Sequence, residues 1–313
     1  MKSKLEMTLA SAVAGAVLFQ LCGCATNNAQ RAEGSEASHF SANAAPQSAE
    51  NPQAQALVEA ARQCCREARY QDAIKKCDDA IGIQANDVIA FCIKGHALHE
   101  MQREQASIEA FNAALRLDRH SVFALAFKAS VLQSLGQIQE SKALLQEIAT
   151  IKPREHDAWD CFSRGCALHI GEDYQGALDK YNQALLIEPG NAEVYFNRGM
   201  AYKMLKHDAE AVNDFEAALK LYPRYAEVYN ELASLLGTEG QFDLAIEDYT
   251  KAIQVNLDYA IVYSNRGLAF AAKPNHDYAA AKEDWDMALK LDPSGIAGQS
   301  AGNYLARLKE MNK

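Results

Sequence analysis

Thiol and imidazole side chains recur at helical spacing in the first half of the chain. Cys92, His96 and His99 stand at i, i+4 and i+7, which places them on one face of a helix. Cys166 and His169 repeat part of this pattern. Thiolates and imidazoles bind soft or borderline metal ions, so the first three residues form a candidate half-site for zinc or copper. No second ligand pair has a matching spacing, and we therefore expect neither a metal nor another cofactor.

The segment Gly298-Gln299-Ser300-Ala301-Gly302 has the spacing of a nucleophile elbow, in which a serine is presented at a sharp turn. That turn needs a preceding strand in an α/β sheet, whereas helical patterns surround this segment. The alternative is a start of small residues to a final helix. No glycine-rich phosphate loop and no His-Glu-x-x-His motif occurs in the sequence. We therefore expect a protein that is not an enzyme.

The N-terminal residues have the features of an export signal. Lys2 and Lys4 precede an apolar run at residues 9–21, which is too short to span a bilayer comfortably. The run ends in Leu21-Cys22-Gly23-Cys24, which resembles the lipobox of bacterial lipoproteins. This resemblance implies a signal peptide at 1–23 and a lipid on Cys24. Ala25, in place of an aspartate, implies an outer-membrane anchor that faces the periplasm; an uncleaved anchor or an ordinary secretory signal is the alternative.

Residues 24–53 connect this signal to the rest of the chain. They are rich in Ala, Ser, Asn, Gln and Glu and contain two of the prolines, which predicts a lipidated flexible tether. A random coil of this length spans roughly 30 Å. Full extension reaches on the order of 100 Å, so we expect the folded part to stand well away from the membrane.

The overall composition is that of a globular protein. The chain has 313 residues, 49% of them hydrophobic and 23% charged, with a net charge of -10 and no cluster of Lys and Arg. The acidic balance argues against nucleic acid as a partner and favours protein partners. Eight cysteines are too few for a disulfide scaffold, although Cys64 and Cys77 could pair on facing helices in an oxidising compartment. Small core cysteines are the alternative.

The elements that would position these residues follow a repeat. Gly165 and Gly199 are thirty-four residues apart, and each precedes an aromatic residue, an Ala-Leu pair and a proline at fixed spacing. Three copies of this ending are Tyr181…Ala184-Leu185…Pro189, Phe215…Ala218-Leu219…Pro223 and Trp285…Ala288-Leu289…Pro293. Small residues allow two helix backbones to approach, and proline follows a helix that it cannot continue.

This pattern resembles the tetratricopeptide repeat, which has two antiparallel helices per unit. The resemblance implies an all-α fold, an α-solenoid in which about seven units form a right-handed superhelix. A single unit cannot bury its apolar face, so the units must stack. We assign the repeats to residues 54–295, with a capping helix at 296–313. The seven units are 54–87, 88–121, 122–155, 158–191, 192–225, 226–259 and 260–295.

The resemblance also implies a site, because the first helix of each unit lines a concave groove in this family. The groove positions of units two to five are aromatic and apolar, which predicts an exposed surface for an apolar or amphipathic segment of a partner protein. Asn197 and Asn265 match the groove asparagine that binds a ligand backbone, whereas the lysine of the carboxylate clamp is absent. The predicted groove residues are Phe123, Phe127, Trp159, Phe162, Phe196, Asn197, Met200 and Asn265.

Three functions are compatible with these features. The favoured one is a membrane-anchored periplasmic adaptor or scaffold, similar in layout to adaptors of peptidoglycan enzymes and to assembly factors of pilus or secretion machinery. The second is a metal- or redox-linked protein that uses the groove Cys and His residues. The third is a structural lipoprotein homodimer, because a tightly curled superhelix would fill its groove with the tether, the cap or a second copy.

Overall fold

The computed structural model describes residues 51–311, which form fifteen α-helices and no strand. The predicted all-α solenoid is confirmed. Within this range, no helix combines the length and the apolar character needed to cross a bilayer. The helices are α2 (Pro52–Arg66), α3 (Tyr70–Ile83), α4 (Val88–Glu100), α5 (Glu104–Leu117), α6 (Val122–Ser134), α7 (Ile138–Thr150), α8 (Ala158–Ile170), α9 (Tyr174–Ile187), α10 (Ala192–Met204), α11 (Asp208–Leu221), α12 (Ala226–Thr238), α13 (Phe242–Val255), α14 (Ala260–Ala272), α15 (Tyr278–Leu291) and α16 (Ile296–Met311).

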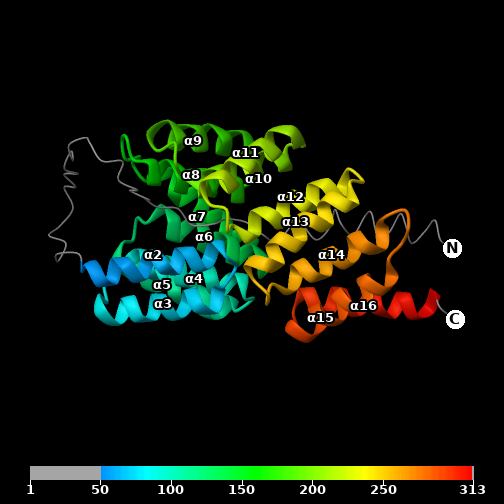
Figure 1. The fold of residues 1–313 in the computed structure, drawn as a ribbon. Coiled ribbons are helices and arrows are strands. Elements are labelled where there is room, and N and C mark those ends of the chain that lie inside the picture. The colour runs from blue at the N-terminus through cyan, green and yellow to red at the C-terminus, as the bar shows by residue number, and fades with distance from the viewer. Residues whose placement is uncertain (1–50, 312–313) are drawn as a thin grey trace.

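Consecutive helices pair into hairpins, from α2–α3 to α14–α15, and α16 packs against the last of them (Figure 1). The turn inside a hairpin is short and contains a residue with positive φ, such as Ala68 at 55° and Glu172 at 65°. Such a residue reverses the chain immediately after the first helix. The chain therefore winds as a stack of hairpins from the blue end at α2 to the red end at α16.

Polar side chains cap the N-terminus of the first helix in five hairpins. Asn51, Asp87 and Asn191 each accept hydrogen bonds from two backbone amides of the following turn, and Ser121 and Asp157 each accept one. These bonds satisfy amides that have no partner inside the helix. Helices α7, α9, α11 and α15 end two or three residues before a proline, as the repeat pattern predicts.

The signature residues of the repeat form the core. Tyr181, Phe215 and Trp285 occupy the same position in three hairpins, and each is buried against the first helix of its own hairpin. Gly165 lies opposite Tyr181, and the absence of a side chain there lets the ring approach the backbone of α8. The interlocking of small and aromatic residues thus fixes how each hairpin closes.

The stack is irregular between α6 and α8. Helix α7 buries only Ser141 and Ile148, and α6 packs directly on α8. The connection at residues 151–157 contains Pro153 and His156, which has a φ of 56°. Arg164 of α8 donates to the carbonyl oxygens of Ile148, in the last turn of α7, and Ile151, at the start of the connection, at 3.3 and 3.0 Å. We call α2–α7 the first arm and α8–α16 the second arm.

Candidate functional site: a closed concave face

The predicted groove residues lie on the concave side of the stack, but most of them are not exposed. Phe162 has no exposed surface, and Phe196 has only 2% of its surface exposed. Phe123, Phe127, Asn197 and Met200 are also buried. Trp159 and Asn265 alone among the eight keep partial exposure. The expectation of an open apolar surface is therefore wrong. That these residues bind a partner stays a prediction.

Four of the predicted residues form a ladder of aromatic rings across the junction of the two arms. Phe123 stacks on Phe127 with a centroid distance of 4.1 Å and on Trp159 with a distance of 4.9 Å. Trp159 packs against Phe162 at 5.7 Å. Contacts of this kind add to the stabilisation from burial. Trp159 is the half-buried member, so it is the point at which this ladder reaches solvent.

Phe196 and Met200 belong to a separate cluster within the second arm. The ring of Phe196 lies 6.0 Å from that of Phe215 and 5.2 Å from that of Tyr225. Met200 is buried in the same cluster. These two side chains therefore join hairpin α10–α11 to hairpin α12–α13, and their removal would damage the core before it affected a ligand.

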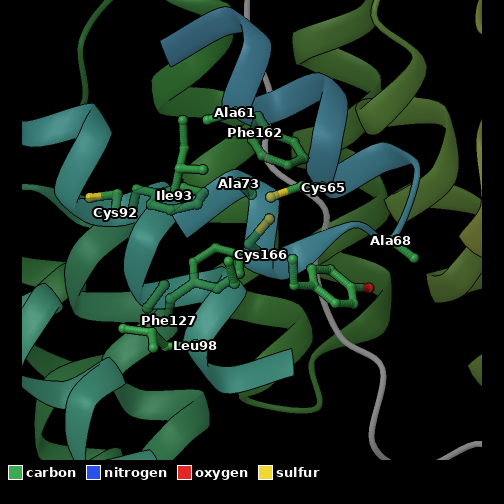
Figure 2. Close-up of a cluster of buried hydrophobic side chains, with 14 of the residues drawn as sticks. Ala61, Cys65, Ala68, Ala73, Cys92, Ile93, Leu98, Phe127, Phe162 and Cys166 are labelled. Carbon is green, nitrogen blue, oxygen red and sulfur yellow. The ribbon is translucent and has the colours of Figure 1, made fainter. Parts of the chain in front are cut away.

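The first hairpin covers the aromatic face. Figure 2 shows Ala61 and Cys65 of α2 in one cluster with Phe162 and Cys166 of α8, and the side chains of Cys65 and Cys166 point toward one another. This packing brings together the first hairpin, α2–α3, and the fourth, α8–α9. The sequence left a self-filled groove as an alternative, with the tether, the cap or a second copy as the filler; in the structure the first repeat fills it.

The turn after α2 then crosses to the second arm. Arg66 Nη1 donates to Glu193 Oε1 of α10 at 2.6 Å, and its guanidinium lies 4.7 Å above the ring of Tyr222. Tyr222 Oη donates to Glu67 Oε1 at 3.1 Å, and Arg224 Nε donates to the same oxygen at 3.0 Å. We call the set of contacts made by residues 66–70 to the second arm the clasp.

Two further contacts complete the clasp. Tyr70 donates a short hydrogen bond to the carboxylate of Glu227 on α12. Asn256 Nδ2, in the turn before α14, donates to the carbonyl oxygen of Ala68 at 3.1 Å. The clasp thus joins one short turn to α10, to α12 and to the turns that precede α12 and α14. It closes the superhelix on itself.

Carboxylates gather where the clasp closes. Burial raises the pKa of Glu227 to about 8 and holds that of Glu100 well above its usual value. Burial also raises the pKa of Glu193, although Arg66 opposes this shift. Glu231 lies beside this group and accepts from Lys203 Nζ at 2.6 Å. Four acidic side chains therefore share an interior with few cations, which is costly unless protons or ion pairs compensate.

Glu67 behaves differently from these carboxylates. Burial by itself raises the pKa of Glu67, but four hydrogen bonds outweigh burial and lower it to about 2. The donors are Arg224, Gln63, Arg69 and Tyr222. Two of these donors come from the second arm, so the ionised state of Glu67 is tied to the closed clasp.

The two predicted groove asparagines are engaged within the protein. Asn197 Nδ2 donates to the backbone carbonyl of Glu193 at 2.8 Å, one turn earlier on α10. Asn265 Nδ2 donates to Asn230 Oδ1 at 3.0 Å, which links α14 to α12. Of the two, Asn265 is the one that keeps contact with solvent.

The metal candidates do not converge. Cys92 hydrogen-bonds with Ser121, whereas His99 Nδ1 lies 2.6 Å from Glu104 Oε2. His96 is buried with its Nδ1 at 3.9 Å from Glu100 Oε1, and burial lowers its pKa to about 3. Within residues 51–311, no three His, Cys, Asp or Glu side chains are grouped so that they could hold a metal ion.

The remaining candidates are placed as follows. Residues 298–302 lie inside α16, with no strand before them among the described residues, so the geometry of a nucleophile elbow is not present there. Cys64 and Cys77 are buried free thiols in the structure. The signal peptide, Cys24 and most of the tether lie outside the described residues.

The clasp residues of the first hairpin were missed by reasoning from the sequence. Arg66, Glu67 and Tyr70 lie in the unit with the weakest repeat signature, where no template draws attention to them. One signal was available. Glu193 and Glu227 stand thirty-four residues apart at the same groove position, and such stacked carboxylates require cations or hydrogen-bond donors from elsewhere.

Comparisons with known proteins agree with this architecture. Models of the tetratricopeptide repeat family match residues 89–121 and 192–225, and a model described as TPR repeat matches residues 165–206 and 238–273. All three models describe the repeat and none describes an enzyme family. No curated protein sequence matches the chain.

Two solved structures have a similar fold. The human IFIT1 dimer with PPP-AAAA is 16% identical with a TM-score of 0.62, over 83% of this chain and 64% of IFIT1, so this chain spans about two thirds of that protein. A tetratricopeptide repeat protein from Parabacteroides merdae is 16% identical with a TM-score of 0.50, over 80% of this chain and 98% of that one. At these identities the likeness concerns the fold. The family matches show that residues 89–121, 165–225 and 238–273 contain tetratricopeptide repeats, a scaffold suited to protein–protein interaction.

Proposed function

We propose that this protein is an adaptor that a lipid on Cys24 anchors to the outer membrane, and that it holds a protein partner on the periplasmic side. The support for the anchor is the lipobox-like sequence that ends at Cys24, followed by Ala25 and a polar tether. One acyl chain binds a protein to a membrane only weakly, so a lipid anchor holds firmly when it carries more than one acyl chain. The tether lets the folded part reach partners at a distance, which raises their local concentration.

The concave face between α4 and α10 is the surface that we propose for the partner. The observation that carries this proposal is the aromatic ladder of Phe127, Phe123, Trp159 and Phe162, which meets solvent at Trp159. Aromatic residues are enriched at the points that dominate binding energy in protein interfaces. An amphipathic helix of a partner would present small apolar residues to this ladder, as Ala61 and Cys65 of α2 do within the chain.

The charges on this face favour protein over RNA as the ligand. IFIT1, which has a similar fold, was solved with PPP-AAAA. Here Arg66 and Lys203, two cations of the concave face, are paired with Glu193 and Glu231, and Glu227 adds a further carboxyl group. A triphosphate would meet a predominantly acidic interior, which repels it.

Site-specific crosslinking in cells tests the adaptor function. A photoreactive phenylalanine analogue at Trp159 should trap a partner, whereas the same analogue at Leu186 should not, because Leu186 is 85% exposed on α9, away from the ladder. Phe196 is unsuitable because it is buried in the core. Equal capture from both positions would refute the concave face as the partner site.

The anchor has its own test. Cys24→Ser should abolish incorporation of labelled palmitate and move the protein from the membrane to the soluble fraction. Palmitate incorporation that persists in Cys24→Ser would refute lipidation at this residue. Light scattering on the full chain in detergent separates a monomeric adaptor from the homodimer alternative.

A further inference from the structure

The clasp is an interface between parts of the chain that are far apart in sequence. Arg66 and Glu193 are separated by 127 residues, Tyr70 and Glu227 by 157, and Ala68 and Asn256 by 188. The contacts that define it are hydrogen bonds, two ion pairs and a cation–π contact. Unlike the apolar packing between neighbouring hairpins, contacts of this type can be exchanged for contacts with water at modest net cost.

Two imidazoles on the concave helices lie in unfavourable surroundings. His96 and His169 are both 1% exposed, and neither ring forms a protein hydrogen bond through its nitrogens. Both lie on concave helices, His96 on α4 and His169 on α8. Each buried polar atom without a partner costs free energy that hydration would restore. The acidic groups around Glu227 add to this cost.

The junction between the arms is the place where the stack can bend. Helix α7 has few buried residues, and residues 151–157 form a connection without helical structure. Every other connection between hairpins described here is shorter, such as residues 188–191 between α9 and α10. Regions with few buried contacts open at the lowest free energy, so we place the bend at α7 and this connection, with the packing of α6 on α8 as its pivot.

We infer that the first arm swings away from the second about residues 151–157, that the clasp is the latch that holds the two arms together, and that opening uncovers the aromatic face. That this opening regulates access of a partner rests on the proposed function. The opening itself takes place in the protein without a partner and is measured there.

Native cysteines report this opening. Cys65 and Cys166 face one another across the two arms, so separation of the arms exposes both thiols (Figure 2). Cys77 is buried on α3 within the first hairpin and stays covered when the arms separate as rigid bodies. The rate of alkylation of each thiol by N-ethylmaleimide is measured on the purified full chain by mass spectrometry of its peptides.

The test compares two latch variants with a matched control. Arg66→Met removes the ion pair to Glu193. Arg224→Met removes the ion pair to Glu67, and because the Arg224 side chain is exposed, this substitution leaves the core intact. Arg198→Met is the control, because Arg198 pairs with Asp214 inside its own hairpin and makes none of the clasp contacts. Far-ultraviolet circular dichroism checks that each variant is folded.

We expect Cys65 and Cys166 to react at least ten times faster in both latch variants than in the wild type and in Arg198→Met, with Cys77 still protected. Unchanged rates at Cys65 and Cys166 would overturn the inference. An equal acceleration at Cys77 would also overturn it, because the hairpin would then unfold instead of swinging. If the arms open while crosslinking at Trp159 gains nothing, the proposed partner site fails and the latch stands.

Discussion

The contact between Gly165 and Tyr181 gives a quantitative test of how the repeat holds together. A Cβ atom at Gly165 would lie 2.5 Å from Cε1 and 2.7 Å from Cδ1 of Tyr181. Carbon atoms in contact normally lie about 3.5–4.0 Å apart, so the ring would have to move by roughly 1 Å. Tyr181 cannot retreat easily, because it is fully buried and packs against Phe162 at 6.0 Å. Overpacking of this kind costs about 1–3 kcal/mol.

The same substitution at Gly302 is the matched control. Gly302 lies inside α16, and no atom lies within 4 Å of the position that its Cβ would take. Alanine is favoured over glycine in a helix by about 1 kcal/mol at both sites, so Gly302→Ala should stabilise the protein by about that amount. Gly165→Ala should therefore be less stable than Gly302→Ala by about 1–3 kcal/mol.

Urea unfolding provides the assay, followed by circular dichroism at 222 nm and by tyrosine and tryptophan fluorescence. Two probes are needed because a solenoid can unfold in parts, and coincident transitions show that one free energy of unfolding applies. Stabilities of Gly165→Ala and Gly302→Ala that agree within about 0.5 kcal/mol would refute the argument that the glycine is required by the close approach of the ring.

Three further predictions concern the interior. A carboxyl group whose pKa is higher in the folded than in the unfolded protein stabilises the fold at pH values below its unfolded pKa, and this contribution is lost as pH rises to the folded pKa. Glu227→Gln should therefore flatten the loss of stability between the usual pKa of a glutamate and pH about 8. A stability profile as steep as that of the wild type would contradict this. Phe196→Ala should cost about 3–5 kcal/mol in urea unfolding because the residue is a core contact, and a loss below about 1 kcal/mol would show that it faces solvent. Lys203→Met leaves Glu231 buried without its cation and should lower the free energy of unfolding by about 3–5 kcal/mol. In a double-mutant cycle, adding Glu231→Leu should restore most of this stability, and no recovery would show that the two residues are not coupled.

Much of the fold could be predicted because the repeat is a local pattern. The spacing of Gly165, Tyr181 and Pro189 reflects contacts within one hairpin and its immediate neighbour. Each such contact is encoded within about forty residues, so a single unit suffices to predict two helices and their order of stacking. The choice of concave positions was likewise local, since it follows from the periodicity of one helix.

The exposure of those positions was not predictable in the same way. Phe162 occupies the expected face of α8 and has no exposed surface, because α2 lies against it. Whether one arm reaches the other depends on small rotations between hairpins that accumulate along the stack. The irregular junction at α7, where α6 packs directly on α8, changes that sum. A groove that is open in one solenoid is therefore closed in another with the same repeat.

By itself, the sequence determined the helices, their pairing and the face that each presents, since these depend on contacts between near neighbours. Its N-terminal motif and acidic charge also set the expectations of a lipid anchor and a protein partner. Only the tertiary structure decided that Arg66 meets Glu193 and Tyr70 meets Glu227, and that the aromatic face lies beneath the first hairpin. The physical reason is that these contacts join residues more than a hundred positions apart, and no local pattern specifies the curvature that brings them together.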